Sequence, residues 1–544
     1  MGEVFFLWVV VVLMGLGVGL VKAWAVVWWR PRMIEAHFGK QGVRGPPYRP
    51  FVGNVREMVS IMLHASALPM PLSHNILPRV LSFYHHWKKI YGGTFLIWFG
   101  PTPRLAVADP ELIREIFFSK SELYEKYESD PLVRQLEGNG LLSLKGEKWA
   151  AHRRIIAPTF HMENLKALIP AIGQAVVQMV EEWERESPES DSGERDIDVS
   201  DRFQRLTGEV ITRSLFGASS YEDGKEVFRL QSQQMTFAAE SFNKVMLPGY
   251  RFLPTKLNAL SRRLNRDVKK SLAALIQKKY AAIKQPGRND PELSQEDDLL
   301  GRMIAASERS ATLSPDSGNG GAAGARFTAD DIVEECKAFF FAGKQTTSNM
   351  LTWTTVLLAM HPDWQEAARA EVLQHCGSRA VPTKDSIHKL KTISMILNES
   401  MRLYPPAVAA IRRAKSDAML GGYRIPAGTE LLIPILAVHH DPRLWGNDAT
   451  EFNPGRFADG VARAAKHPMA FLPFGLGPRT CVGQNLALLQ AKIVLAVILQ
   501  RFSFRLSPSY RHSPSVLMLL YPQHGAPISF KPLEPSHGSR RRSS

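Results

Sequence analysis

The interpretation of this chain depends on one stretch, Phe474-Gly-Leu-Gly-Pro-Arg479-Thr-Cys481-Val-Gly483. A cysteine lies in a loop bounded by glycines, an arginine stands just before it, and an apolar run of helical character follows from Leu486. A thiolate in such a loop can be the axial ligand of a haem iron and favours O–O cleavage. The alternative is that Cys481 is a small buried apolar residue, as free cysteines often are.

The residues around the cysteine suit a ligand loop. Gly477 and Gly483 allow unusual backbone dihedrals and a close approach to a flat cofactor. Arg479 can pair with a haem propionate. Backbone N–H groups around the sulfur and the N-terminus of the next helix are expected to hold the cysteine as thiolate, with a pKa below the usual value of about 8.5.

Composition limits the class of protein. The chain has 544 residues, 45% of them hydrophobic, which is ample for a large core, and its length alone would suggest several domains. The cysteines are Cys336, Cys376 and Cys481; without a CxxC pair, neither a zinc site nor a disulfide framework is expected, and the body belongs in a reducing compartment. A net charge of +15 favours an anionic membrane or an acidic protein partner. No nucleic-acid-binding motif is visible, so nucleic acid is not an expected partner.

The N-terminus predicts a membrane anchor over residues 1–29. An uninterrupted apolar run from Val4 to Val21 would span about 27 Å as a helix, enough for one bilayer crossing. A cleaved signal peptide is the rival, with a cleavage-like site at Ala23-Trp24-Ala25. The positive charges follow the run instead of preceding it, which favours a retained anchor with the body in the cytosol.

Behind the anchor, residues 30–50 are expected to form a basic Pro/Gly hinge, because the prolines in Gly42–Tyr48 cannot continue a helix. Gly93 to Val107 reads as a hairpin, and the chain from Pro110 to about Lys284 is mostly helical in pattern.

In the second half of the chain, loop and helix signals define further segments. Polar, Gly-rich residues at about 286–326 predict a flexible loop. Phe327 to His361 predicts a long helix, started by a capping box of Thr328 and Asp331. Val516 to Phe530 predicts a final hairpin, and residues 532–544 a polar, basic, disordered tail.

A second candidate for chemistry interrupts the long helix at Ala342-Gly343-Lys-Gln345-Thr346-Thr. Glycine is costly in a helix interior, and threonine hydroxyls compete for backbone hydrogen bonds. Together they can open a notch where dioxygen meets the helix, with Thr346 donating a hydrogen bond and helping to deliver protons. The alternative is a helix with a small-residue packing contact.

Two further groups carry charge. Glu399 and Arg402 share one helical face amid apolar neighbours, which indicates a buried pair that needs another partner, and Arg456 is the candidate. Trp149 and Arg153 lie one helical turn apart and can bind one carboxylate, such as a haem propionate.

These signals, in this order, resemble the cytochrome P450 family over essentially everything after the anchor. The resemblance implies a mainly α fold: a single helical haem domain at 51–531 with a small β region, preceded by one transmembrane helix. It implies haem b as the cofactor, with Cys481 as its axial thiolate. The positions that correspond to haem-binding residues are Cys481, Trp149, Arg153, Arg412, Phe474, Arg479 and Gly483.

The resemblance also assigns the remaining positions. Ala342, Gly343, Gln345 and Thr346 match the oxygen-binding motif, and Glu399, Arg402 and Arg456 match the structural network. Many members carry an acid where this chain has Gln345, so proton delivery is expected to depend on Thr346 and ordered water. Residues expected near the substrate are Phe339, Phe340, Val408, Ile411 and Leu519.

Within the family the chain is similar to plant microsomal enzymes of the brassinosteroid-inactivating branch. Leu136–Trp149, Phe160–Leu165, Phe339–Asn349, Arg412–Asp417 and Tyr521–Pro527 carry this likeness. It implies hydroxylation of a steroid side chain at C-26, in the endoplasmic reticulum membrane, with electrons from NADPH–cytochrome P450 reductase. Candidate reductase contacts are Lys145, Lys148, Arg153, Arg154 and Lys492. The alternatives are oxidation of a cytokinin or gibberellin, and a haem protein that binds a lipid without turnover.

Overall fold

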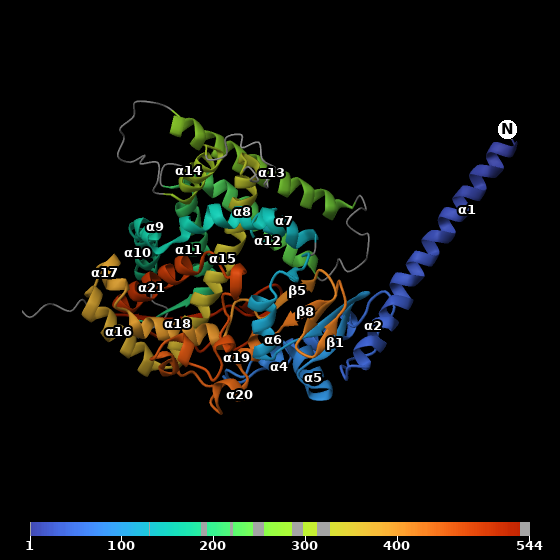
Figure 1. Ribbon diagram of the computed structural model, residues 1–544. Coiled ribbons are helices and arrows are strands. Elements are labelled where there is room, and N and C mark those ends of the chain that lie inside the picture. The colour runs from blue at the N-terminus through green and yellow to red at the C-terminus, as the bar shows by residue number, and fades with distance from the viewer. Residues whose placement is uncertain are drawn as a thin grey trace, which may run out of the picture. The chain divides into compact units, whose positions relative to one another are not determined.

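The computed structural model describes residues 2–129, 131–186, 193–217, 221–242, 255–284, 298–312 and 327–533. These residues are mainly helical, with small sheets, as expected (Figure 1). The chain divides into two compact units. Unit 1 comprises Met1–Tyr127, Val408–Glu451 and Ala465–Pro478, and unit 2 comprises Glu128–Ala407, Phe452–Ala464 and Arg479–Ser544.

Unit 1 begins with the apolar N-terminal helix. α1 (Gly2–Trp24) passes through a π-helical turn at Ala25–Trp29 into α2 (Arg30–Gly39), which has Pro31 in its first turn. Val4–Gly39 is long and apolar enough to cross a membrane by length and composition, and its most apolar stretch is not buried against protein. The expectation of a hinge across 30–50 is therefore wrong for its first half, because proline is tolerated where a helical turn begins.

The rest of unit 1 is built around a sheet of strand order β1-β2-β8-β5-β3. The expected hairpin is confirmed as β1 (Phe95–Phe99) and β2 (Thr102–Ala106), paired antiparallel. β8 (Glu430–Ile433) joins β2 in parallel, β5 (Ala410–Ala414) joins β8, and β3 (Tyr124–Lys126) closes the edge. β6 (Ala418–Leu420) and β7 (Tyr423–Ile425) form a separate hairpin.

The helices of unit 1 are short. After α2 they are α3 (Val55–Ala67), α4 (Leu77–Val80), α5 (Ser82–Tyr91), α6 (Pro110–Arg114), α19 (Ile435–His439) and α20 (Pro442–Trp445).

Unit 2 is organised by α15 (Ala329–Met360), the long yellow-green helix of Figure 1. The Thr328–Asp331 capping box is present. The helix ends at Met360, because the next residue, His361, precedes Pro362 and so disfavours the helical region. α15 packs against α7, α11, α13, α18 and α21. Its central position makes it the element on which the other helices of this unit are placed.

The other main helices of unit 2 surround α15. They are α7 (Pro131–Glu137), α8 (Gly146–Ile156), α9 (Met162–Leu165), α10 (Ile169–Arg185), α11 (Val199–Phe216), α12 (Tyr221–Phe242), α13 (Lys256–Lys284), α14 (Leu299–Thr312), α16 (Pro362–Cys376), α17 (Lys384–Ile387), α18 (Lys391–Leu403) and α21 (Gln484–Arg501). α21 is the helix expected after the cysteine, and it is buried nearly all round.

Two expectations about unit 2 are wrong. The predicted loop at 286–326 contains α14, because Leu299, Leu300, Met303 and Ile304 bury an apolar face that the polar flanks conceal in the sequence. The rest of that loop lies outside the described residues.

The predicted final hairpin is also different. β10 (Pro514–Val516) pairs with β11 (Leu520–Pro522), whereas β12 (Pro527–Pro532) lies between β4 (Arg195–Asp198) and β9 (Phe502–Leu506). Of the predicted tail, residues from 534 lie outside the described part.

The predicted network of Glu399, Arg402 and Arg456 is present in the structure. Glu399 and Arg402, both 0% exposed, form an ion pair at 2.7 Å. Arg456 Nε lies 3.1 Å from the same carboxylate, and the backbone N–H of Asn453 donates to it at 2.9 Å. α18 is thereby tied to the segment 452–457 by a carboxylate with several donors, as a buried charge requires.

Replacing Glu399 by Gln should destabilise the protein by about 3–5 kcal/mol, because Arg402 would remain buried without a counter-charge. Thermal unfolding followed by circular dichroism measures the loss. The matched control is Glu226→Gln, which removes an exposed ion pair with Arg229 on α12. Equal melting temperatures for the two variants would contradict a structural role for the network.

Candidate active site

Cys481 lies in a tight loop between a 3-10 turn at Gly477–Arg479 and the start of α21. Its side chain is exposed, yet the protein crowds the thiol closely enough that burial raises its pKa. The backbone N–H groups of Gly483 and Gln484 and the guanidinium of Arg153 act in the opposite direction. Cys481 thus combines an exposed residue with N–H donors and a cation close enough to act on its thiol.

The expectation that the surrounding amides hold this pKa below the usual value is wrong, because the cost of burial outweighs the N–H groups and Arg153. A bound metal ion deprotonates its thiol ligand outright. The protein's own contribution is to place two backbone N–H groups and Arg153 near the sulfur, where they reduce the cost of its charge.

The other cysteines differ in their surroundings. Cys336 on α15 is buried, and burial raises its pKa, with the neighbouring Glu335 and Asp298 adding to the effect. Cys376 ends α16 half-buried, and burial raises its pKa too. A thiol enclosed beside two acids stays neutral and offers no free side to a ligand, so Cys481 alone of the three combines access with a nearby cation.

Helix α8 brings two predicted residues to this loop. The guanidinium of Arg479 stacks 4.2 Å from the ring centroid of Trp149, and it donates to the carbonyl of Leu144 at 2.9 Å. Arg479 therefore ties the cysteine loop to the start of α8. Arg153 lies half-buried on α8, where burial lowers its pKa and Cys481 opposes that shift.

Arg153 has the properties of a residue that binds an anion. Within the described part of the chain it has no hydrogen-bond or ion-pair partner, although it is half-buried. A partly desolvated guanidinium is stabilised by a carboxylate that it can bind through two N–H groups. The donor set of an accessible thiol, an indole N–H on Trp149 and this cation fits a haem with its propionates.

Unit 1 holds the other predicted haem contacts. Arg412 on β5 lies with its guanidinium 4.7 Å from the Phe117 ring, and Phe474 lies half-buried just before the turn. Gly477 has φ +69, and a Cβ there would lie 2.1 Å from the carbonyl oxygen of Phe117. No sequence pattern indicated Phe117, whose ring lies against Arg412 and whose carbonyl oxygen lies against Gly477.

Gly483 behaves differently from Gly477. Its φ of −87 is ordinary, so the expectation of an unusual dihedral is wrong for this residue. A Cβ on Gly483 would meet nothing within 4 Å, so packing within the protein does not require glycine at this position.

The oxygen motif lies on α15 without a break in the helix, so the expected interruption is wrong. Gly343 serves close packing, since a Cβ there would lie 3.1 Å from Ile211 of α11. The Thr346 hydroxyl donates to the carbonyl of Ala342 one turn earlier, and Gln345 donates to Asn349 at 3.3 Å. To donate elsewhere, Thr346 has to give up a local hydrogen bond.

Some of the expected substrate residues are buried and others are half-buried. Phe340 is 1% exposed and packs on Phe228, with ring centroids 5.6 Å apart, so it is a core residue. Phe339 contacts Phe160 at 5.2 Å between ring centroids. Val408 is buried, whereas Ile411 and Leu519 are half-buried in their own units.

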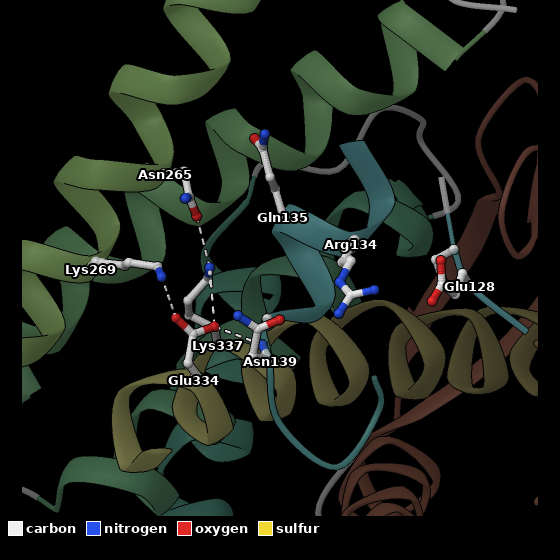
Figure 2. A pocket seen from close by; sticks show the side chains of 10 residues that line it. Glu128, Arg134, Gln135, Asn139, Asn265, Lys269, Glu334 and Lys337 are labelled. Carbon is white, nitrogen blue, oxygen red and sulfur yellow. Dashed lines mark hydrogen bonds and ion pairs between the residues drawn. The ribbon is translucent and has the colours of Figure 1, made fainter. Parts of the chain in front are cut away.

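A polar cavity of about 260 Å³ lies among α7, α13 and α15 (Figure 2). Lys337 donates to Asn265 at 2.8 Å there. Glu334 forms ion pairs with Lys337 at 3.8 Å and with Lys269, and it accepts from the backbone N–H of Asn139. Burial lowers the pKa of Lys337 to about 8, although Glu334 opposes the shift. By helical periodicity Lys337 and Thr346 lie on opposite faces of α15, so this cavity is separate from the candidate active site.

The comparison with known families agrees with this geometry. The family model for cytochrome P450 matches residues 69–529, which include parts of both units. The chain belongs to the cytochrome P450 family. It is 64% identical over 515 residues to cytochrome P450 734A1 of Arabidopsis thaliana, covering 94% of this chain and 95% of that protein.

Two further relatives show the breadth of the likeness. Cytochrome P450 734A6 of Oryza sativa subsp. japonica is 60% identical over 94% of each chain. Secologanin synthase 2 of Catharanthus roseus is 40% identical over 95% of this P450 and 96% of the relative.

Membership makes this P450 a haem-thiolate monooxygenase, as expected. When bound, a thiolate-ligated haem supplies dioxygen activation and O–O cleavage. Cys481 would hold the iron, and Trp149 and Arg153 would hold a propionate. The cationic Arg153 stabilises negative charge at the sulfur, and the stacked Arg479 keeps the loop against α8.

The cysteine assignment can be tested by two serine variants. Cys481→Ser should abolish the thiolate-type Soret band of the reduced carbon monoxide complex, because a hydroxyl is a poor ligand in place of the thiolate. Cys336→Ser should retain that band, since its thiol is enclosed by protein. Loss of the band in Cys336→Ser with retention in Cys481→Ser would reverse the assignment.

Proposed function

We propose that this P450 hydroxylates the side chain of a brassinosteroid at C-26 and thereby inactivates the hormone. The observation that carries the proposal is the likeness of five separate stretches, from Leu136–Trp149 to Tyr521–Pro527, to the branch with that activity. The 64% identity to cytochrome P450 734A1 extends over nearly the whole chain, and so includes these stretches.

The proposed residue roles come from the resemblance to the family, and the contacts described above support some of them. Cys481 ligates the iron, while Trp149, Arg153 and Arg412 bind the propionates. Thr346 turns its hydroxyl from Ala342 towards the oxygen site and passes protons from ordered water. Gln345 cannot relay a proton by ionising, so its amide holds Asn349 and water in place.

Apolar residues are proposed to hold the steroid. The residues proposed to supply hydrocarbon surface are Phe339 on α15, Val408 just before β5, Ile411 in β5, and Leu519 in the turn between β10 and β11. Apolar walls with a few polar groups suit a hydroxylated steroid. Phe340 is one of the expected residues too, and its ring packs on Phe228, so it is the least accessible of the set.

The enzyme is proposed to lie in the endoplasmic reticulum membrane, anchored by α1, and to accept electrons from NADPH–cytochrome P450 reductase. Of the basic residues considered for that contact, Lys145 and Lys148 already pair with Glu128 and Asp331. Burial lowers the pKa of Lys492, which is half-buried. Arg154 is exposed, and it is the strongest candidate of the set.

The substrate is tested by incubating the full chain with reductase, NADPH and separate brassinosteroids, cytokinins and gibberellins, followed by mass spectrometry. We expect a product heavier by one oxygen from brassinosteroids, with the new hydroxyl at the end of the side chain. Turnover confined to cytokinins or gibberellins would refute the proposal and favour the alternative hormone class.

Thr346→Ala should lower hydroxylated product per NADPH consumed by roughly tenfold, because proton delivery loses its hydroxyl. Thr346→Ser should stay near the wild-type ratio. The matched control is Thr355→Ala, which removes a similar hydroxyl that donates one turn back on the same helix, at 2.9 Å to Leu351. If Thr346→Ala forms as much hydroxylated product per NADPH as the control variant does, Thr346 has no proton-delivery role.

A further inference from the structure

His152 has an unusual position between the two residues that face the cysteine loop. It lies on α8 directly before Arg153 and within one turn of Trp149, but its own ring is 2% exposed. Nδ1 lies 2.7 Å from Glu335 of α15, and Nε2 lies 3.6 Å from Asp331. The ring also packs edge-on against Phe327, with centroids 4.9 Å apart.

The acids that hold His152 are themselves held. Glu335 is 0% exposed, and its second oxygen accepts from the backbone N–H of Leu141 at 3.0 Å. A Cβ on Gly140 would lie 2.6 Å from that oxygen, so this position requires glycine. Although burial alone would raise it, the pKa of Asp331 lies below its usual value because Thr328 and Lys148 donate to the carboxylate.

These contacts join α8 to α15. Besides packing against α14 and the 3-10 turn that follows it, α8 reaches α15 through the side chains of His152 and Lys148. Nδ1 of His152 and Oε1 of Glu335 lie 2.7 Å apart, and a carboxylate can only accept hydrogen bonds, so the ring is the donor towards a carboxylate. The bridge is therefore directional, and it is shielded from competing water.

We propose that His152 is a positioning residue of the haem site: its bridge to Glu335 and Asp331 fixes the rotation of α8 and so directs Trp149 and Arg153 to the Cys481 loop. Successive helical residues are rotated by about 100°. Locking His152 therefore locks Trp149 and Arg153, which share a neighbouring stripe. The stack of Trp149 on Arg479 and the field of Arg153 at Cys481 depend on that rotation.

Within unit 2, the same bridge connects the propionate residues on α8 with the oxygen motif on α15. Glu335, Phe339, Ala342 and Thr346 recur at the spacing of one face of α15. Glu335 holds α8 on this face, and Phe339 packs on Phe160 in the turn after α8. The face that carries the oxygen motif is thus the face that positions the propionate residues.

The test compares His152→Leu with His152→Asn in the purified full-length holoenzyme. Leucine removes the N–H, whereas the asparagine amide can place an N–H near the position of Nδ1. For His152→Leu we expect haem transfer to apomyoglobin to be about tenfold faster, as is typical when a residue supporting ligands is lost. We also expect a lower reduction potential, because Arg153 no longer stabilises the reduced iron. His152→Asn should return both values most of the way to wild type.

His512→Leu is the matched control, because His512 is also buried and bonds to Tyr510 at 2.9 Å, away from α8. It should lower thermal stability without changing haem transfer or potential. The inference is overturned if His152→Leu keeps the wild-type haem transfer rate and potential, or if His152→Asn and the control lose both as far as His152→Leu. Should His152→Leu not fold, Glu335→Gln must shift both values in the same direction, and unchanged values would overturn the inference.

Discussion

Charge held away from water is the constraint on which unit 2 depends. The Glu399 carboxylate takes two arginines and a backbone N–H, and Glu335 takes His152 and a second backbone N–H. Neither acid can lose a partner without leaving an uncompensated charge in the interior. These clusters lie at different points of the helical core, and each joins segments distant in the sequence.

At the candidate active site, the charge of the Cys481 thiolate is only partly compensated by its neighbours. Burial disfavours the thiolate of Cys481, and Arg153 with two backbone N–H groups only reduces that cost. The sulfur is therefore set among groups that favour its charged form, and Arg153 is suited to binding an anion. A haem with its propionates suits both at once, which explains why the family's cofactor and these residues fit together.

Sequence patterns predicted the features that depend on neighbouring residues. The Thr328–Asp331 cap, the β1–β2 hairpin and the Glu399–Arg402 spacing all appear where expected. The patterns failed where distant packing decides the outcome. α14 forms in a segment with polar flanks because the core accepts its apolar face, and Gly343 is glycine because Ile211 lies against it. The residues next to α14 and Gly343 in the sequence give no indication of these packing partners, which come from distant parts of the chain.

The sequence by itself determined the family, the fold class and the cysteine that combines a ligand loop with a following helix, since these follow from short-range spacing of a few residue types. Only the tertiary structure decided what each charge meets: Arg479 stacks on Trp149, Phe117 lies against Gly477 and Arg412, and His152 reaches two acids on α15. Such contacts join residues far apart along the chain, and burial, which sets their strength, exists only once the chain has folded.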